Sequence, residues 1–114
     1  MHELSIARDL VDLAVEEAAR AGASRVVRVK LRLGALAGVI PPALHTAFAA
    51  ARLGTPAANA ALDIDAVPAA VRCARCACDR ELPNPCVRRC PACGTPAEAL
   101  CAGDELELAE IEVA

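Results

Sequence analysis

Hydrophobic and polar residues follow two different periods along the chain, and these periods predict two helices and three strands. Residues 3–21 repeat apolar side chains every three or four positions with charged side chains between them, which is typical of a helix with one buried face. Residues 42–52 form a second, alanine-rich helical segment that begins at a pair of prolines. Residues 26–33, 61–67 and 104–113 alternate apolar and polar positions, which indicates strands.

The strand pattern also indicates how the sheet is paired. Residues 26–33 place Val and Leu on one face and Arg and Lys on the other, so we expect one buried face, one solvated face and antiparallel pairing. Glu105 and Glu107 lie on the polar face of the last strand, where they can face those cations and set the register. We therefore expect an α+β fold with two helices and a three-stranded, mostly antiparallel sheet.

A different kind of segment separates the second strand from the third. Residues 69–102 hold all seven cysteines and four of the prolines, and they show little hydrophobic periodicity. Such a segment cannot fold around an ordinary apolar core, so a metal ion is expected to stabilise it. We expect residues 69–102 to form an inserted domain, with residues 1–68 and 103–114 forming the domain of helices and sheet.

The cysteine spacing predicts a zinc-ribbon-like site with four thiolate ligands. Cys73 and Cys76 form one CxxC motif, and after 13 residues Cys90 and Cys93 form a second, which Gly94 follows. Four thiolates complete a tetrahedron around Zn(II) and leave no open position, so the zinc is expected to be structural. A rubredoxin-like iron site and a redox dithiol are the alternatives, but the first motif lacks a following glycine, and a redox site needs only one motif.

Four further side chains have no definite assignment from the sequence. Cys78 lies two residues after a predicted ligand and is a candidate for ligand exchange. Cys86 and Cys101 are expected to be small buried apolar residues. His45 lies in the second helix, where we expect a surface or hydrogen-bonded residue, with a role as an additional metal ligand as the weaker alternative.

The first three residues, Met1-His2-Glu3, have a specific metal chemistry. The free amine, the His2 amide and imidazole, and the Glu3 amide can place four nitrogens in one plane, which suits Ni(II) or Cu(II) and does not suit Zn(II). The Glu3 carboxylate can add a ligand or orient the imidazole. From residue types alone, a solvated histidine without a role is the simpler interpretation.

Charge and composition narrow the function classes. The 12 basic and 15 acidic residues give a net charge of −3, which argues against binding nucleic acid by neutralising phosphates. The sequence predicts no transmembrane helix and no secretory signal, so with an odd number of cysteines we expect a reducing, cytoplasmic location. The sequence shows no pairing of a base with a nucleophile that would indicate an enzyme. The inserted segment holds five arginines. The alternative function is therefore that of a zinc-ribbon module that binds protein or nucleic acid.

The motifs, taken in order, resemble the HypA/HybF family of hydrogenase maturation proteins over essentially the whole chain. They are Met-His-Glu-Leu-Ser at the start, Leu-Arg-Leu-Gly-Ala-Leu at 31–36, the two CxxC motifs, and Gly-Asp-Glu-Leu at 103–106. The resemblance implies a nickel metallochaperone that delivers Ni(II) to [NiFe] hydrogenase and, in some relatives, to urease. It also implies two helices on a three-stranded sheet, with the zinc domain inserted before the last strand.

The same resemblance implies the metal ligands and the partners. Nickel is expected on the amine of Met1, on His2 and on the Glu3 backbone, with the Glu3 carboxylate nearby. Zinc is expected on the four cysteines of the CxxC motifs, Cys73, Cys76, Cys90 and Cys93. The implied partners are a HypB-type GTPase, the precursor of the hydrogenase large subunit and, where urease is a client, urease accessory proteins.

Overall fold

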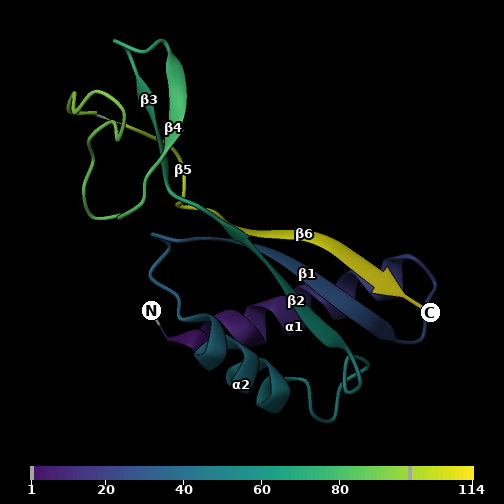
Figure 1. Cartoon of the computed structure of the whole chain (residues 1–114). Helices are drawn as coiled ribbons and strands as arrows, with labels where there is room; N and C mark the ends of the chain where they lie inside the picture. Colours follow the sequence, from purple (N-terminus) through teal and green to yellow (C-terminus); the bar gives the residue numbers. More distant parts are fainter. Residues whose placement is uncertain (1, 98) are drawn as a thin grey trace. The chain divides into compact units, whose positions relative to one another are not determined.

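The computed structural model describes residues 2–97 and 99–114 of the chain (Figure 1). Its elements, in chain order, are α1 (Glu3–Arg20), β1 (Val26–Gly34), α2 (Pro41–Ala51), β2 (Ala61–Val67), β3 (Ala70–Cys73), β4 (Cys78–Glu81), β5 (Leu100–Ala102) and β6 (Leu106–Val113). The chain divides into two compact units. The first comprises the residues before Leu33, together with Gly38–Asp65 and Glu107–Ala114, and the second comprises Leu33–Ala37 and Ala66–Leu106.

Helix α1 confirms the helical period predicted near the N-terminus. Its buried residues recur every three or four positions, and they are Ile6, Ala7, Leu10, Val11, Ala14 and Ala18. At its C-terminal end Gly22 has a φ of 72°, a left-handed conformation that glycine adopts without strain. The amides of Gly22 and Ala23 donate to the carbonyls of Ala19 and Ala18, at 3.1 and 2.9 Å, so the helix ends in a Schellman motif.

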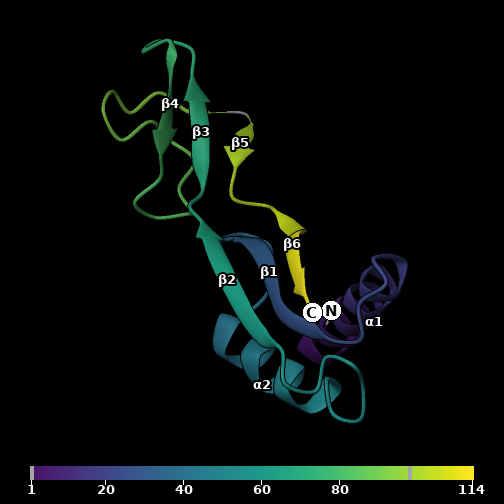
Figure 2. The same cartoon turned by 90° about the vertical axis from the view of Figure 1, so that its right-hand side faces the viewer.

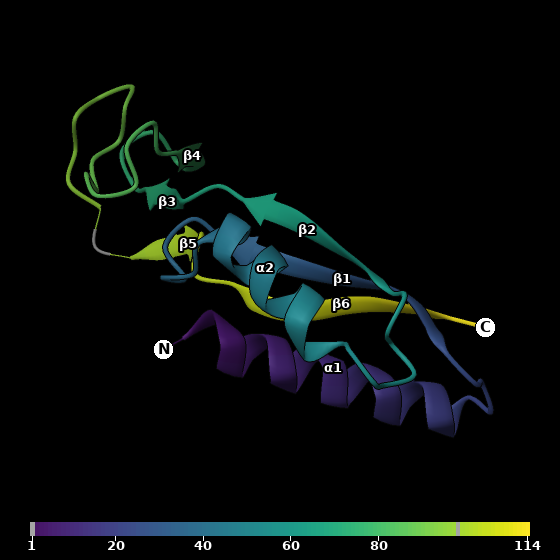
Figure 3. The same cartoon turned by 90° about the horizontal axis from the view of Figure 1, so that it is seen from below.

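Helix α2 begins with Pro41 and Pro42, because the first turn of a helix needs no amide donors from within the helix. It buries Leu44 and Phe48, which are at most 2% exposed. Figures 1 and 3 show α1 and α2 on the same face of the sheet β2–β1–β6, so the apolar core of the first unit lies between that face and the two helices. Among the described residues, no helix combines the length and the apolar character needed to cross a membrane.

The first sheet has the strand order β2–β1–β6 and is mixed. Strands β1 and β6 run antiparallel, since Arg25 and Ala114 exchange backbone hydrogen bonds at 3.2 and 3.0 Å and the later residues of β1 pair with earlier residues of β6. Strands β1 and β2 run parallel, with α2 in the connection between them. The sequence predicted a mostly antiparallel sheet, whereas one of its two strand pairs is parallel. The alternation within each strand did not distinguish these directions.

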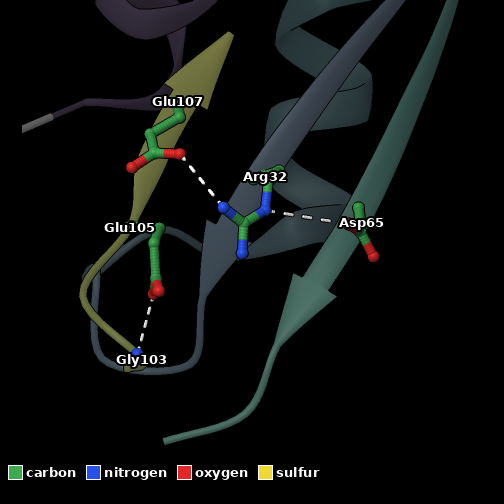
Figure 4. A network of polar contacts seen from close by, with 5 residues as sticks. All are labelled: Arg32, Asp65, Gly103, Glu105 and Glu107. Atoms are coloured by element: carbon green, nitrogen blue, oxygen red, sulfur yellow. Dashed lines mark hydrogen bonds and ion pairs between the residues drawn. The ribbon is translucent and has the colours of Figure 1, made fainter. Parts of the chain in front are cut away.

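Charged pairs follow the strands of this sheet, and Figure 4 shows one set of them. The guanidinium of Arg32 on β1 lies 3.9 Å from a carboxylate oxygen of Asp65 on β2 and 3.3 Å from a carboxylate oxygen of Glu107 on β6. The predicted pairing of Glu107 with a cation of β1 is therefore confirmed. All these side chains are well exposed, so each pair contributes about 1 kcal/mol at most, and the charges mainly favour this register.

The second sheet lies in the second unit and has the order β4–β3–β5, with β3 antiparallel to both neighbours (Figure 2). The unit has a small apolar cluster of Ala69, Val71 and Leu82, and Leu36, Ala97 and Leu100 pack against that cluster. The hydrophobic pattern did not predict these strands. Each has only three or four residues, and β4 reads Cys-Asp-Arg-Glu, which has no apolar alternation to detect.

Two glycines from distant motifs meet in the second unit. The Gly34 amide donates to the Glu105 carbonyl and the Leu36 amide to the Gly103 carbonyl, both at 2.7 Å. A Cβ on Gly34 would lie 2.2 Å from the Gly103 carbonyl oxygen, and a Cβ on Gly103 would lie 2.6 Å from Ala69 Cα. Both positions therefore need glycine because two backbones approach each other closely. Glu105 fastens the same turn, since its carboxylate accepts a 2.7 Å hydrogen bond from the Gly103 amide (Figure 4).

Candidate metal centres

The structure brings the four cysteines of the CxxC motifs together. Cys73 is the last residue of β3 and Cys76 lies in the turn to β4, while Cys90 and Cys93 lie in the loop that precedes β5. The four Sγ atoms all lie within 4.8 Å of one another. The Cys73–Cys93 sulfurs are 3.6 Å apart and the Cys76–Cys90 sulfurs 3.9 Å apart.

These sulfur–sulfur distances fit a tetrahedral metal site. A Zn–S bond of about 2.3 Å places neighbouring sulfurs of a tetrahedron about 3.8 Å apart. A disulfide would need sulfurs about 2.05 Å apart, and all four cysteines are free thiols. Cys73 and Cys90 are each 2% exposed, so half of the ligand set is shielded from water. The donor set and its spacing therefore suit Zn(II).

The two CxxC turns share a left-handed residue at the same position. The residue after the second cysteine of each motif has a positive φ, 55° at Ala77 and 74° at Gly94. In the first turn the Cys76 amide donates to Cys73 Sγ at 3.4 Å. Glycine adopts this conformation freely, whereas alanine is strained in it. The first motif therefore keeps a positive φ at this position without a glycine, at the cost of backbone strain at Ala77.

Neighbouring groups shift the pKa values of these thiols in opposite directions. The Thr95 hydroxyl and backbone amide stabilise the thiolate of Cys93 and lower its pKa to about 6, and the two side chains are 3.1 Å apart. For Cys76 the largest influence is a hydrogen bond from the Arg80 guanidinium, which lowers the pKa. The sulfurs of Cys93 and Cys73 outweigh it and raise the pKa of Cys76 to about 11. The opposite shifts follow from the close approach of the four sulfurs, since a proton on one sulfur stabilises a negative charge on its neighbour.

At the other candidate site, Met1 lies outside the described residues, and the structure describes His2 and Glu3. His2 is exposed and extended, with φ −98° and ψ 139°, and it caps α1. Its carbonyl accepts hydrogen bonds from the Ser5 and Ile6 amides at 3.0 and 3.4 Å. The helix begins at Glu3, so the amides of His2 and Glu3 stand outside its hydrogen-bond ladder and can serve as metal ligands.

The Glu3 carboxylate makes a contact that sequence analysis did not predict. One of its oxygens accepts a hydrogen bond from the Ile40 amide at 3.4 Å, just before α2 begins. Hydrogen bonds from its own amide and from the Ile40 amide hold the pKa of Glu3 below its usual value. The carboxylate is thus ionised and anchored beside the predicted nickel ligands.

The remaining candidates fall in three different environments. Cys78 is half-buried on β4 and pairs with Cys73 across the hairpin. Cys86 and Cys101 are exposed, so the prediction that they are buried was wrong. Cys86 follows a proline in a turn, and Cys101 lies on the outward face of the three-residue strand β5. His45 lies exposed on α2, as expected for a surface residue.

Three of the five arginines of the inserted segment are engaged within the second unit. Arg72 pairs with Asp79 at 3.6 Å, and Arg89 donates to the Gly94 carbonyl at 3.3 Å. The Arg80 guanidinium contacts the sulfur of Cys76. These contacts leave a smaller basic surface than the sequence indicated, which weakens the case for nucleic-acid binding.

Comparison with known proteins gives a consistent result along the whole chain. Residues 1–113 match the family described as "Hydrogenase/urease nickel incorporation, metallochaperone, hypA". The hydrogenase maturation factor HypA of Chloroflexus aggregans is 50% identical over 112 residues, which cover 98% of both chains. The corresponding factor of Synechococcus elongatus is 43% identical over 113 residues, which cover 99% of both.

Two solved structures share the fold. The solution structure of the Ni metallochaperone HypA from Helicobacter pylori matches with a TM-score of 0.66 at 23% identity, covering 99% of this chain and 97% of that one. A second HypA solution structure matches with a TM-score of 0.73 at 23% identity, covering 100% and 97%. With the family match over residues 1–113 and relatives that are up to 50% identical, this chain belongs to the HypA family of nickel-incorporation metallochaperones and hydrogenase maturation factors.

Proposed function

We propose that this chain binds Ni(II) at its N-terminus and delivers it during the maturation of [NiFe] hydrogenase. The observation that carries the proposal is the family match over residues 1–113, which includes the Met-His-Glu start. The family description names urease as well as hydrogenase, so urease is the second client to test. A carrier of this kind transfers its metal and performs no chemistry on a substrate.

The proposed nickel ligands are the amine of Met1, the amide and imidazole nitrogens of His2, and the amide of Glu3. Four nitrogens in a plane select Ni(II) over Zn(II) by geometry. Copper binds such a set more tightly still, so copper availability in the cell must exclude it. The exposure of His2, and the position of the His2 and Glu3 amides outside the hydrogen-bond ladder of α1, support the proposal, since a carrier must also release its metal. Acid weakens this binding because protons compete for the same nitrogens.

The proposed role of Cys73, Cys76, Cys90 and Cys93 is to hold a structural Zn(II). Metal binding of this kind contributes about 10 kcal/mol or more to the folding of a small domain. In this assignment residues 69–102 are the zinc-binding domain, and residues 1–68 and 103–114 form the nickel-binding domain. The zinc site requires reduced thiols, which the cytoplasm maintains, so we expect the protein to act there.

The proposed partners are a HypB-type GTPase, the precursor of the hydrogenase large subunit and, with urease as a client, urease accessory proteins. We place the docking surface on the zinc-binding domain. Val87 in that domain is 49% exposed, so an apolar side chain is available there for contact. Replacing residues 69–102 by a short linker should abolish partner binding, and full binding without them would remove this part of the proposal.

A maturation assay tests the delivery of nickel. Cells that rely on this chain for hydrogenase maturation should lose hydrogenase activity and nickel content of the enzyme with His2→Ala, and excess nickel in the medium should restore part of both. His45→Ala is the matched control, since it removes the other histidine at an exposed site. Urease activity followed in the same cells identifies the clients. Full hydrogenase activity with His2→Ala would contradict the proposal.

A further inference from the structure

One face of the β3–β4 hairpin points toward the four-cysteine site. Cys73 pairs with Cys78 and Val71 with Arg80 across the two strands. Residues opposite each other on paired strands share a face, and so do residues two apart on one strand. Arg80 is therefore on the same face as Cys73, one of the proposed zinc ligands.

The other face of the hairpin points to solvent. Arg72 and Asp79 form the intervening cross-strand pair, and their side chains meet at 3.6 Å with about 60% of each exposed. Arg80 is half-buried in contrast. The hairpin thus presents two arginines to two different environments, and this provides a natural control within one element.

The guanidinium of Arg80 interacts with the sulfurs on this face. It contacts the sulfur of Cys76, and the charges of Cys78 and Cys90 also act on it. Its Nε is buried and has no hydrogen-bond partner among the described residues. A buried N–H group is rarely left without an acceptor in a folded protein. On the face of the hairpin that carries Arg80, a thiolate sulfur can serve as the acceptor for this N–H group.

Charge gives the reason for an arginine at this place. Zn(II) with four thiolates carries a net double negative charge, which is costly in a shielded site. A guanidinium beside the sulfurs offsets part of that charge, and its planar set of N–H donors can address more than one sulfur. Groups that contact metal ligands in this way usually change metal affinity strongly when they are removed.

We propose that Arg80 is a positioning residue of the four-cysteine site, which donates hydrogen bonds to the metal-bound sulfur of Cys76 and slows the loss of zinc. The inference rests on the proposed occupancy of that site by zinc. It assigns to a residue outside the CxxC motifs a role in retaining the metal.

Zinc release measures this role directly. Zinc-loaded wild-type protein, Arg80→Met, Arg80→Lys and Arg72→Met are mixed with excess chelator, and the transfer of zinc to a chromogenic indicator is followed. Arg80→Met should release zinc about 10-fold faster or more. Arg80→Lys keeps the charge and should fall between Arg80→Met and the wild type, whereas Arg72→Met should behave as the wild type.

Cobalt substitution separates a bond to sulfur from a general loss of stability. In the Co(II)-loaded protein, loss of a hydrogen bond to Cys76 should move the sulfur-to-cobalt charge-transfer band to lower energy in Arg80→Met and leave it unchanged in Arg72→Met. If Arg80→Met does not fold, Arg80→Lys decides through the same two measurements.

The outcomes distinguish the inference from its premise. Equal release rates and equal spectra for the Arg80 and Arg72 variants would overturn the role of Arg80 and leave the zinc assignment intact. Wild-type protein that takes up neither zinc nor cobalt would overturn both.

Discussion

Different interactions stabilise the two units of this chain internally. The first unit contains the largest fully buried apolar side chains, which are Phe48, Leu31, Leu44, Val26 and Val29. Among the described residues, the second unit has a core cluster of Ala69, Val71 and Leu82, with three partly buried apolar side chains against it, together with four crowded sulfurs. A buried large apolar side chain contributes about 1.5–3 kcal/mol, so three residues of this size cannot fold a segment of this length. Apolar burial is sufficient for the first unit, whereas under the proposed zinc assignment the second unit depends on its metal.

The largest effect should come from removing the metal. Zinc removal by a chelator, or Cys90→Ser, should unfold the second unit and leave the first folded, at a cost of about 10 kcal/mol or more. Amide hydrogen exchange can observe both units at once. The Leu82 amide, bonded to the Ala69 carbonyl at 2.8 Å, should lose its protection, while the Val26 amide, bonded to the Pro56 carbonyl at 3.0 Å, should keep it.

The exposed thiols supply the control for that experiment. Cys86→Ser and Cys101→Ser should leave both zinc content and amide protection unchanged, because neither sulfur belongs to the cluster. A Leu82 amide that stays protected in the metal-free protein would contradict the contrast between the two units.

The converse prediction concerns the apolar core. Phe48→Ala should lower the free energy of unfolding of the first unit by about 3–5 kcal/mol, since Phe48 is 2% exposed and leaves a cavity. Urea unfolding followed by the helical circular dichroism signal measures the change, and zinc stoichiometry should not change. Leu53→Ala is the control, because Leu53 is 70% exposed and should cost less than about 0.5 kcal/mol. A loss of zinc with Phe48→Ala would show that the two units depend on each other.

The contact between the two glycine motifs comes next in size. Gly34→Ala should destabilise the second unit by about 3 kcal/mol, because the new Cβ would overlap backbone atoms that cannot move aside. Gly38→Ala is a useful comparison, since Gly38 has a φ of 76° and open space around it, so the cost there is backbone strain of about 1 kcal/mol. Amide exchange at Leu36 measures the loss of stability in Gly34→Ala, and urea unfolding followed by the helical circular dichroism signal measures it in Gly38→Ala. Equal effects at the two glycines would mean that the close approach is unimportant.

The smallest expected effect is a gain in stability. Ala77→Gly should stabilise the second unit by about 1 kcal/mol, because Ala77 has a φ of 55° and glycine relieves that strain. The reverse change at the matching position of the other turn, Gly94→Ala, should cost a similar amount. Exchange of the Leu82 amide in the zinc-loaded protein measures both changes. A loss of stability with Ala77→Gly would show that the alanine methyl group makes contacts that offset its strain.

The sequence predicted the first unit better than the second for a physical reason. Each helix and strand of the first unit buries one face, and burial produces the periods that sequence analysis detects. The direction of β2 beside β1 was missed because an alternating strand has the same pattern in either direction, although the helix predicted between the two strands is typical of a parallel crossover. In the second unit the CxxC spacing predicted the sulfur cluster, because ligand spacing follows from metal geometry.

Contacts between distant residues account for what the sequence did not indicate. The hydrogen bond between Glu3 and Ile40 and the approach of Gly34 to Gly103 both join residues from separate elements. No local period carries such information. For Cys86 and Cys101 the error had a different origin. Cysteine in general prefers buried positions, but these two lie exposed in a turn and on an edge strand.

A nickel titration tests the central claim most directly. Zinc-loaded protein with a free, untagged N-terminus is titrated with Ni(II) and followed by absorbance, beside His2→Ala and beside His45→Ala as the control. We predict uptake of one equivalent of nickel with the spectrum of planar Ni(II) in the wild type and in His45→Ala, and loss of that uptake in His2→Ala with the fold and zinc intact. Unchanged nickel affinity in His2→Ala would contradict the N-terminal site.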